Sequence, residues 1–252
     1  ANEGSIARTS ATGGALDPEF LAWQTSLPFD QRLLDVDCAG SIAHVGSLVE
    51  AGIVTAEEGE QLRAALEAIP EKIDAGELEL PLEEDVHMAV EVLVKRLAGD
   101  VADKMHTGRS RNDQIATLVR LYLLDHSRTI ARDILRVIDA LTSQAEAHPD
   151  AIMPGRTHLQ HAQPVLLAHH LQAHAWPLVR DLERLRDWSV RASVSPYGGG
   201  ALAGSTLGLD PQLVADELGL ARPAENSLDG TSSRDVVAEF AFIAAMIGVD
   251  LS

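Results

Sequence analysis

The sequence predicts an all-α protein built around long helices, and three observations support this fold class. Aromatic residues make up only 4% of the 252 residues and hydrophobic residues 46%, with abundant Ala and Leu, which favours helix over sheet. Apolar residues recur at helical spacing over residues 112–147, which would form a helix about 50 Å long. The apolar stripe of such a helix exceeds what one small domain covers, so a helical bundle is expected.

Four segments are predicted before this long helix. Residues 1–16 are small and polar, and we expect an extended or poorly ordered arm there. A helix is predicted over residues 30–51. A capping box at Thr55 starts a second helix, which ends near Gly76. A third helix is predicted over residues 83–97.

Further segments are predicted after His148-Pro149, which ends the long helix. They are a long helix that starts with Pro164, bends at Pro177 and ends near Ala192, a glycine-rich loop at residues 198–208, a short helix near residues 210–218 and a long helix from Ser232. The last helix is still apolar and uncapped at Ser252, which predicts that the chain is part of a longer polypeptide.

The composition also limits the classes of protein to which this chain can belong. A formal net charge of -18 argues against nucleic acid and anionic membranes as partners. No apolar run approaches the roughly 20 residues that a membrane-spanning helix needs. The single cysteine, Cys38, excludes an internal disulfide framework and lies in an apolar-periodic stretch, where a buried, inert thiol is expected. We therefore expect a soluble, cytoplasmic protein.

Two polar turns stand out from this helical background. The first is His106-Thr-Gly-Arg-Ser-Arg-Asn-Asp-Gln114, which has few side chains suited to burial. Arg109 and Arg111 offer forked donors, Asn112 offers an amide, and Gly108 allows close approach of the backbone to a ligand. A helix starting near Asn112 would add free N–H groups, so the turn predicts an anion site. The alternative is a solvated turn with an Asn cap.

The second polar turn is Met153-Pro-Gly-Arg-Thr-His-Leu-Gln-His-Ala-Gln-Pro164. It places a hydroxyl donor, Thr157, beside His158, the side-chain type best suited to proton transfer near neutral pH. Each turn stands immediately before a predicted long helix. The pair therefore predicts one shared site.

Together the two turns resemble the argininosuccinate lyase family of the aspartase/fumarase superfamily, which includes the δ-crystallins. Further matches are Glu84-Asp-Val-His87, Ser195-Pro-Tyr-Gly-Gly-Gly-Ala-Leu-Ala-Gly204 and Asn226-Ser-Leu-Asp-Gly-Thr-Ser-Ser-Arg-Asp235. The resemblance runs from about Ser26 to the last residue. It implies a small N-terminal helical domain over residues 17–105, and then, over residues 106–252, the first part of a central helical bundle that is truncated at its C-terminal end.

The resemblance also implies an activity and a set of site residues. The implied enzyme is a cofactor-free and metal-free homotetramer with active sites shared between subunits, which eliminates arginine from argininosuccinate to give fumarate. His158 would be the acid/base. The substrate would be held at its succinyl carboxylates by Ser26, Ser110, Arg111, Asn112 and Thr157, and at its amino-acid end by Asp85 and His87. Four of these residues also have a structural interpretation: a surface hydroxyl for Ser26, a helix cap for Asn112, and a solvated helix edge for Asp85 and His87.

The sequence departs from the family pattern in two places. The family's loop of Gly-Ser-Ser followed by Met-Pro and lysines does not occur up to Ser252, nor does the glutamate that tunes the histidine. This predicts an N-terminal part that is inactive alone. The usual Trp-Gly-x-Arg-Phe opening is replaced by Gly4–Gly14, where Arg8 could take the place of the basic residue. Two alternatives therefore stay open: a paralogous lyase for another N-substituted succinate, and a non-catalytic crystallin-like protein or fragment.

Overall fold

The computed structural model describes residues 18–252 and confirms the predicted helical fold, with only short strands between the helices. The expected N-terminal arm lies outside the described residues. The chain divides into two compact units, the first comprising the residues up to Tyr122 together with Val194–Ser232, and the second Leu123–Ser193 with Ser233–Ser252. The predicted division between residues 105 and 106 stays a prediction.

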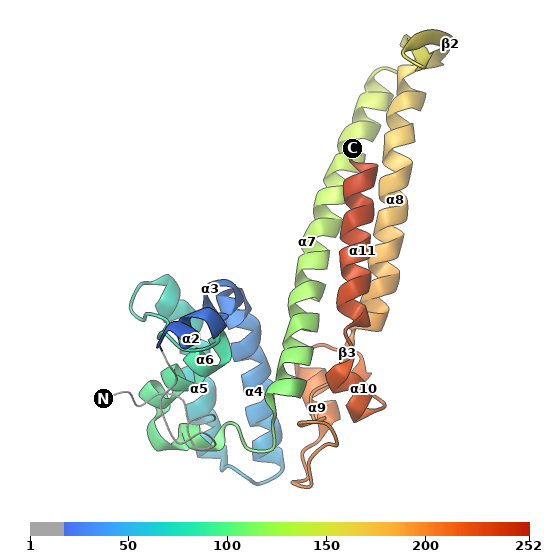
Figure 1. The fold of residues 1–252 in the computed structure, drawn as a ribbon. Helices are drawn as coiled ribbons and strands as arrows, with labels where there is room; N and C mark the ends of the chain where they lie inside the picture. Colours follow the sequence, from blue (N-terminus) through green and yellow to red (C-terminus); the bar gives the residue numbers. More distant parts are fainter. Residues whose placement is uncertain (1–17) are drawn as a thin grey trace. The chain divides into compact units, whose positions relative to one another are not determined.

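The first unit contains the helices that precede the long helix. They are α2 (Pro18–Gln24), α3 (Leu27–Asp30), the 3-10 helix η1 (Gln31–Leu33), α4 (Leu34–Glu50), α5 (Ala56–Asp74), α6 (Val86–Ala98) and the 3-10 helix η2 (Gly99–Lys104). Helices α4, α5 and α6 pack together in this unit (Figure 1). Their shared core includes the fully buried side chains of Leu62, Leu66 and Leu93.

Local signals explain most of these helix ends. The capping box at Thr55 is confirmed: its hydroxyl accepts from the backbone N–H of Glu58, and the Glu58 carboxylate accepts from the N–H of Thr55. Helix α6 begins later than predicted because Asp85 is its N-cap. The single helix predicted over residues 30–51 is wrong at its start, where α3, η1 and α4 follow one another.

The long helix is confirmed as α7, which runs through 37 residues from Arg111 to Ala147 and contributes to both units. The first unit is completed by short elements. These are β3 (Val194–Ser195), α9 (Pro211–Glu217), β4 (Arg222–Pro223), which pairs in parallel with β3, and α10 (Ser227–Ser232), which was not predicted.

The second unit consists of three long helices and a hairpin. The later part of α7 lies alongside α8 (Leu167–Ala192) and α11 (Asp235–Asp250), as Figure 1 shows. Trp188 of α8 is fully buried, with its ring centroid 4.9 Å from that of Phe240, and its indole N–H donates to the carbonyl of Val236 over 2.9 Å. This side chain is one of the contacts that hold α8 against α11, together with the ion pair between Arg191 and Glu239.

A hairpin stands where the sequence predicted the start of the second long helix. Strands β1 (Ile152–Thr157) and β2 (Gln160–Leu166) pair antiparallel, with Pro154 opposite Pro164. The prediction that Pro164 begins a helix is therefore wrong. Both strands are edge strands, which tolerate proline because only one side of each is paired.

Among residues 18–252, no helix combines the length and the apolar character needed to cross a membrane.

Candidate active site

The first unit brings six of the eight predicted site residues to neighbouring positions, beginning with Ser26. The backbone N–H of Ser26 donates to the carbonyl of Glu84 over 2.8 Å, and its hydroxyl donates to the Asp30 carboxylate over 2.5 Å. The other oxygen of Asp30 accepts from the N–H of Val86 at 3.1 Å. These bonds join the start of α3 to the start of α6. Ser26 is half-buried and its hydroxyl is hydrogen-bonded, so its interpretation as a solvated surface hydroxyl is wrong.

Asp85 and His87 occupy very different environments, although they are two residues apart. One oxygen of Asp85 accepts from the N–H of Met88 at 2.7 Å, and the other lies 4.0 Å from Arg111 Nε. His87 is only 3% exposed, and its Nδ1 lies 3.1 Å from Oδ1 of the buried Asp37. The interpretation of His87 as solvated on a helix edge is therefore wrong.

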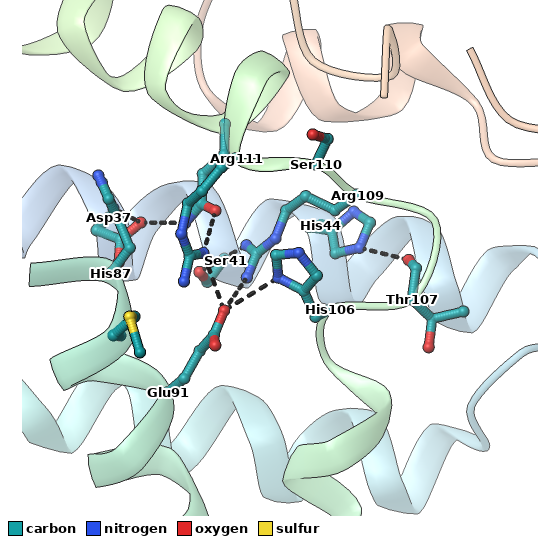
Figure 2. A network of polar contacts seen from close by, with 12 residues as sticks. Asp37, Ser41, His44, His87, Glu91, His106, Thr107, Arg109, Ser110 and Arg111 are labelled. Atoms are coloured by element: carbon teal, nitrogen blue, oxygen red, sulfur yellow. Dashed lines mark hydrogen bonds and ion pairs between the residues drawn. The ribbon is translucent and has the colours of Figure 1, made fainter. Parts of the chain in front are cut away.

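Arg111 is anchored through one nitrogen. Its Nη1 donates to Glu91 Oε1 over 2.9 Å and to Gln114 Oε1 over 2.8 Å (Figure 2 shows the Glu91 contact). The amide of Gln114 in turn donates to Asp37 Oδ1 over 2.6 Å. Asp37 therefore links His87 to Arg111 through Gln114. Burial alone would raise the pKa of Asp37, but His87, Arg109 and Gln114 together hold it below its ordinary value.

A second carboxylate, Glu91 on α6, faces residues 106–111, hereafter called the arginine turn. Besides Arg111, it contacts His106 Nδ1 at 3.0 Å and Arg109 Nη2 at 3.8 Å (Figure 2). Burial opposes ionisation, but the His106 contact and the Arg111 guanidinium outweigh it and lower the pKa of Glu91 to about 2. Glu91 is therefore ionised at neutral pH.

Arg109 is held inside the protein. It is 7% exposed, and its Nη1 donates to Ser41 Oγ and to the hydroxyl of Tyr197, each over 2.9 Å. Next to it, Nε2 of His44 lies 3.0 Å from the carbonyl of Thr107, and burial, with the charge of Arg109, lowers the pKa of His44 to about 3. The prediction that Arg109 offers its donors to a ligand is wrong, and so is the alternative of a solvated turn, because Arg109 is buried and bonded to Ser41 of α4.

The start of α7 carries Ser110 and Asn112. The Ser110 hydroxyl accepts from the N–H of Asn112 over 3.3 Å, and the N–H of Ser110 donates to Asp113 Oδ1 over 3.0 Å. Ser110 therefore caps the helix, and the interpretation of Asn112 as the cap is wrong. The Asn112 amide instead donates to the carbonyl of Ala201 over 2.9 Å, in the glycine-rich loop.

Asp113 ties this loop to α7 and was missed as a site residue. Its Oδ1 accepts from the N–H groups of Ser110 and Gln114, both at 3.0 Å, and its Oδ2 accepts from Gly198 at 3.1 Å and Gly200 at 2.9 Å. The carboxylate is fully buried, and burial raises its pKa. The spacing Ser-x-x-Asp, a variant of the capping box, was the sequence signal that could have identified it.

Thr157 and His158 belong to the second unit, at the tip of the β1–β2 hairpin. Both are exposed, and Thr157 pairs with Gln160 across the turn. His158 and Leu159 form the turn with φ values of 51° and 63°, in the left-handed region that side chains other than glycine rarely adopt. The turn projects His158 to solvent at a strained position, a feature typical of functional residues.

Metal-ligating clusters do not occur in the part of the chain that the structure describes. His170 and His174 are exposed on α8, where their rings meet edge to face with centroids 5.0 Å apart. Cys38 is buried as predicted, and burial raises the pKa of its thiol.

Comparison with known proteins places this arrangement in a family. A family model described as lyase matches residues 11–252. The chain belongs to the lyase family. Within this family, it is 58% identical over 253 residues to argininosuccinate lyase of Leifsonia xyli subsp. xyli, a match that covers 100% of this chain and 53% of the relative. It is 60% identical over 234 residues to argininosuccinate lyase of Kineococcus radiotolerans, covering 92% and 48%.

Solved lyase structures show the same fold. A variant of EDDS lyase with bound fumarate is 32% identical, with a TM-score of 0.76 and coverage of 92% of this chain and 46% of that one. The family resemblance predicted from the two polar turns is confirmed. This lyase-family chain spans about half the length of the curated relatives that it matches.

Proposed function

We propose that this chain is the N-terminal half of an argininosuccinate lyase, which eliminates arginine from argininosuccinate to give fumarate in arginine biosynthesis. The structural observation that carries the proposal is the Arg111 guanidinium, anchored on one side by Glu91 and Gln114 at the start of α7 and still 27% exposed. Such a planar fork suits a carboxylate of the succinyl group. The identities of 58% and 60% to curated argininosuccinate lyases support the choice of substrate.

The neighbouring donors fit the same role. Ser110 and Asn112 flank Arg111 in the chain, the backbone of Ser26 is bonded to that of Glu84 beside Asp85, and Thr157 would add a hydroxyl from the hairpin. We assign the carboxylate of Asp85 to the α-ammonium of the arginine moiety, because unlike charges attract there. His87 would lie behind Asp85, and its ring would be oriented by Asp37, whose Oδ1 lies 3.1 Å from His87 Nδ1.

The reaction needs a base, an acid and a site for developing negative charge. The base removes a proton from the succinyl carbon next to the one that carries nitrogen, and the electron pair moves toward the adjacent carboxylate. The C–N bond then breaks, the C=C bond of fumarate forms, and the departing guanidino nitrogen receives a proton. We assign an acid/base role to His158, and we expect the carbanion-forming base in the part of the relatives that this chain does not cover.

Donors aimed at the carboxylate that gains charge lower the barrier of this elimination. Each well-placed donor is worth about 3–4 kcal/mol when the charge develops in a site from which water is excluded. The partial positive charge at the N-terminus of the 37-residue helix α7 adds to the effect of Arg111. No metal or cofactor enters this scheme.

We further propose that the complete protein is a homotetramer with shared active sites. Helices α7, α8 and α11 carry large apolar side chains that a neighbouring subunit would cover, since exposed apolar patches of this kind mark interfaces. They are Leu135, Val137, Trp176, Val190, Phe242 and Val249. A shared bundle would also let His158 of one subunit serve the Arg111 site of another.

Substrate preference separates this proposal from a paralogous lyase and from a non-catalytic homologue. For the complete enzyme we expect kcat/KM for argininosuccinate to exceed that for other N-substituted succinates by roughly a hundredfold or more, because the site contacts both ends of the substrate. A higher kcat/KM for another N-substituted succinate would show that the enzyme is a paralogous lyase. No turnover of any of them would leave the non-catalytic alternative.

A further inference from the structure

Glu91 receives all three basic side chains of the arginine turn. Its Oε1 lies 2.9 Å from Arg111 Nη1, 3.0 Å from His106 Nδ1 and 3.8 Å from Arg109 Nη2. The residue lies on α6, one helical turn after His87, and its side chain is 34% exposed. Figure 2 shows the three basic groups converging on this one carboxylate.

The contacts of Arg111 determine which edge of its guanidinium can meet a ligand. Nη1 carries two N–H bonds, and these are directed to Glu91 Oε1 and Gln114 Oε1. A carboxylate that binds with two parallel hydrogen bonds must then use the edge formed by Nε and Nη2. Asp85 Oδ2 lies 4.0 Å from Nε, at ion-pair rather than hydrogen-bonding distance, and no hydrogen bond to Nε or Nη2 is described among residues 18–252.

We propose that Glu91 is a positioning residue for substrate binding, which holds the Arg111 guanidinium so that its Nε–Nη2 edge faces a substrate carboxylate. The assignment rests on the proposed function, in which Arg111 binds the succinyl group. Glu91 itself does not touch the substrate in this scheme. It acts through Arg111.

The charge of Glu91 is essential to this role because it lies between two guanidinium groups. Arg109 is fixed by Ser41 and Tyr197, and its side chain is only 1% exposed. Arg111 is 27% exposed and is therefore the group free to move. Without the intervening carboxylate the two cations repel each other, and among the described contacts Gln114 remains the only hydrogen-bonded anchor of Arg111, with Asp85 at 4.0 Å.

The test compares two Glu→Gln variants of the complete enzyme. Glu91→Gln keeps the shape and removes the charge. Glu217→Gln is the matched control, because Glu217 and Arg63 form an ion pair of the same 2.9 Å length, with side chains 31% and 33% exposed, outside the site. We expect Glu91→Gln to lower kcat/KM for argininosuccinate by at least about tenfold, mainly through KM, since a small misplacement of a binding group has effects of this size. Glu217→Gln should stay within about twofold of the unaltered enzyme.

A double-mutant cycle shows whether Glu91 acts through Arg111. In an Arg111→Ala background, Glu91→Gln should change kcat/KM by less than about twofold, because no guanidinium is left to position. An equal loss in both backgrounds would overturn the proposal, and so would an increase in kcat/KM, which would mean that Glu91 only competes with the substrate for Arg111. If Glu91→Gln does not fold, Glu91→Asp replaces it with the same two criteria, because the shorter side chain keeps the charge but withdraws the carboxylate from Arg111 Nη1.

Fumarate affinity gives a readout that does not depend on turnover. Calorimetric titration of the complete enzyme should show a fumarate Kd about tenfold weaker in Glu91→Gln than in Glu217→Gln. An unaltered enzyme that binds fumarate but does not turn over argininosuccinate would refute the proposed function alone. Equal fumarate Kd values for the two variants would refute the role of Glu91.

Discussion

Asp113→Asn is expected to detach the glycine-rich loop from the start of α7. The two carboxylate oxygens serve different segments: Oδ1 accepts from the N–H groups of Ser110 and Gln114, and Oδ2 accepts from those of Gly198 and Gly200. Asparagine has one acceptor oxygen and one NH2 donor. In either orientation of the amide, two backbone N–H groups would face a donor.

The expected cost follows from these two lost acceptors. Each buried N–H group left without a partner costs about 1–3 kcal/mol, which gives roughly 2–6 kcal/mol for the pair. Removing a buried charge offsets part of this cost, since burial already raises the pKa of Asp113. A net loss of about 2–4 kcal/mol in local stability is therefore expected. It corresponds to amide exchange that is roughly 30-fold to 1,000-fold faster at the pair of N–H groups that faces the NH2, either Gly198 and Gly200 or Ser110 and Gln114.

Hydrogen–deuterium exchange of the complete enzyme, resolved over residues 110–114 and 195–208, measures this effect. Asp210→Asn is the control, because Asp210 is an exposed N-cap whose carboxylate accepts only from the N–H of Gln212 among the bonds described, and Asn caps equally well. The control should leave exchange at Gly198 and Gly200 unchanged. Exchange in Asp113→Asn within about threefold of the control at both pairs of N–H groups would refute the assignment of the two carboxylate oxygens to these partners.

Three further predictions concern the site. Arg111→Lys should reduce kcat/KM almost as far as Arg111→Ala, because an ammonium group does not reproduce the planar fork of the guanidinium. If steady-state kinetics show that Arg111→Lys retains most of the activity, Arg111 contributes only its positive charge. His158→Asn should lower kcat by roughly 10²–10⁴ with little change in thermal midpoint, because the residue is exposed at the hairpin tip; a destabilised variant with near-normal turnover would make His158 structural. Glu91 has its pKa lowered from 4.5 to about 2, so its stabilising effect is full above pH 4.5 and is lost as the pH falls toward 2. The thermal midpoints of the unaltered enzyme and Glu91→Gln should therefore converge over that range, and a constant difference would contradict the shifted pKa.

Local signals in the sequence were enough to predict much of the fold. The helical spacing over residues 112–147 corresponds to α7, and the capping box at Thr55 marks the start of α5. The apolar context of Cys38 correctly indicated burial. These features depend on neighbours within one or two helical turns, which is the range over which a sequence pattern carries information.

Features that depend on distant contacts were not predictable in the same way. The β1–β2 hairpin turns at His158-Leu159 without the Asn or Gly that usually marks such a turn, so the pattern indicated a helix start instead. Arg109 was predicted as a ligand donor because its buried partners, Ser41 and Tyr197, lie 68 and 88 residues away. No sequence pattern indicated a role for Glu91, because α6 meets the arginine turn only in the folded protein.

Product analysis of the complete enzyme tests the central claim most directly. Incubation with argininosuccinate should release fumarate, followed by its ultraviolet absorbance, and arginine in equal amounts. Arg111→Ala should reduce kcat/KM for this release by at least about a hundredfold, since each donor to the reacting carboxylate is worth roughly 3–4 kcal/mol. Failure of the unaltered enzyme to release both products, or an Arg111→Ala variant with unaltered kcat/KM, would contradict the proposal that the start of α7 holds the succinyl group of argininosuccinate.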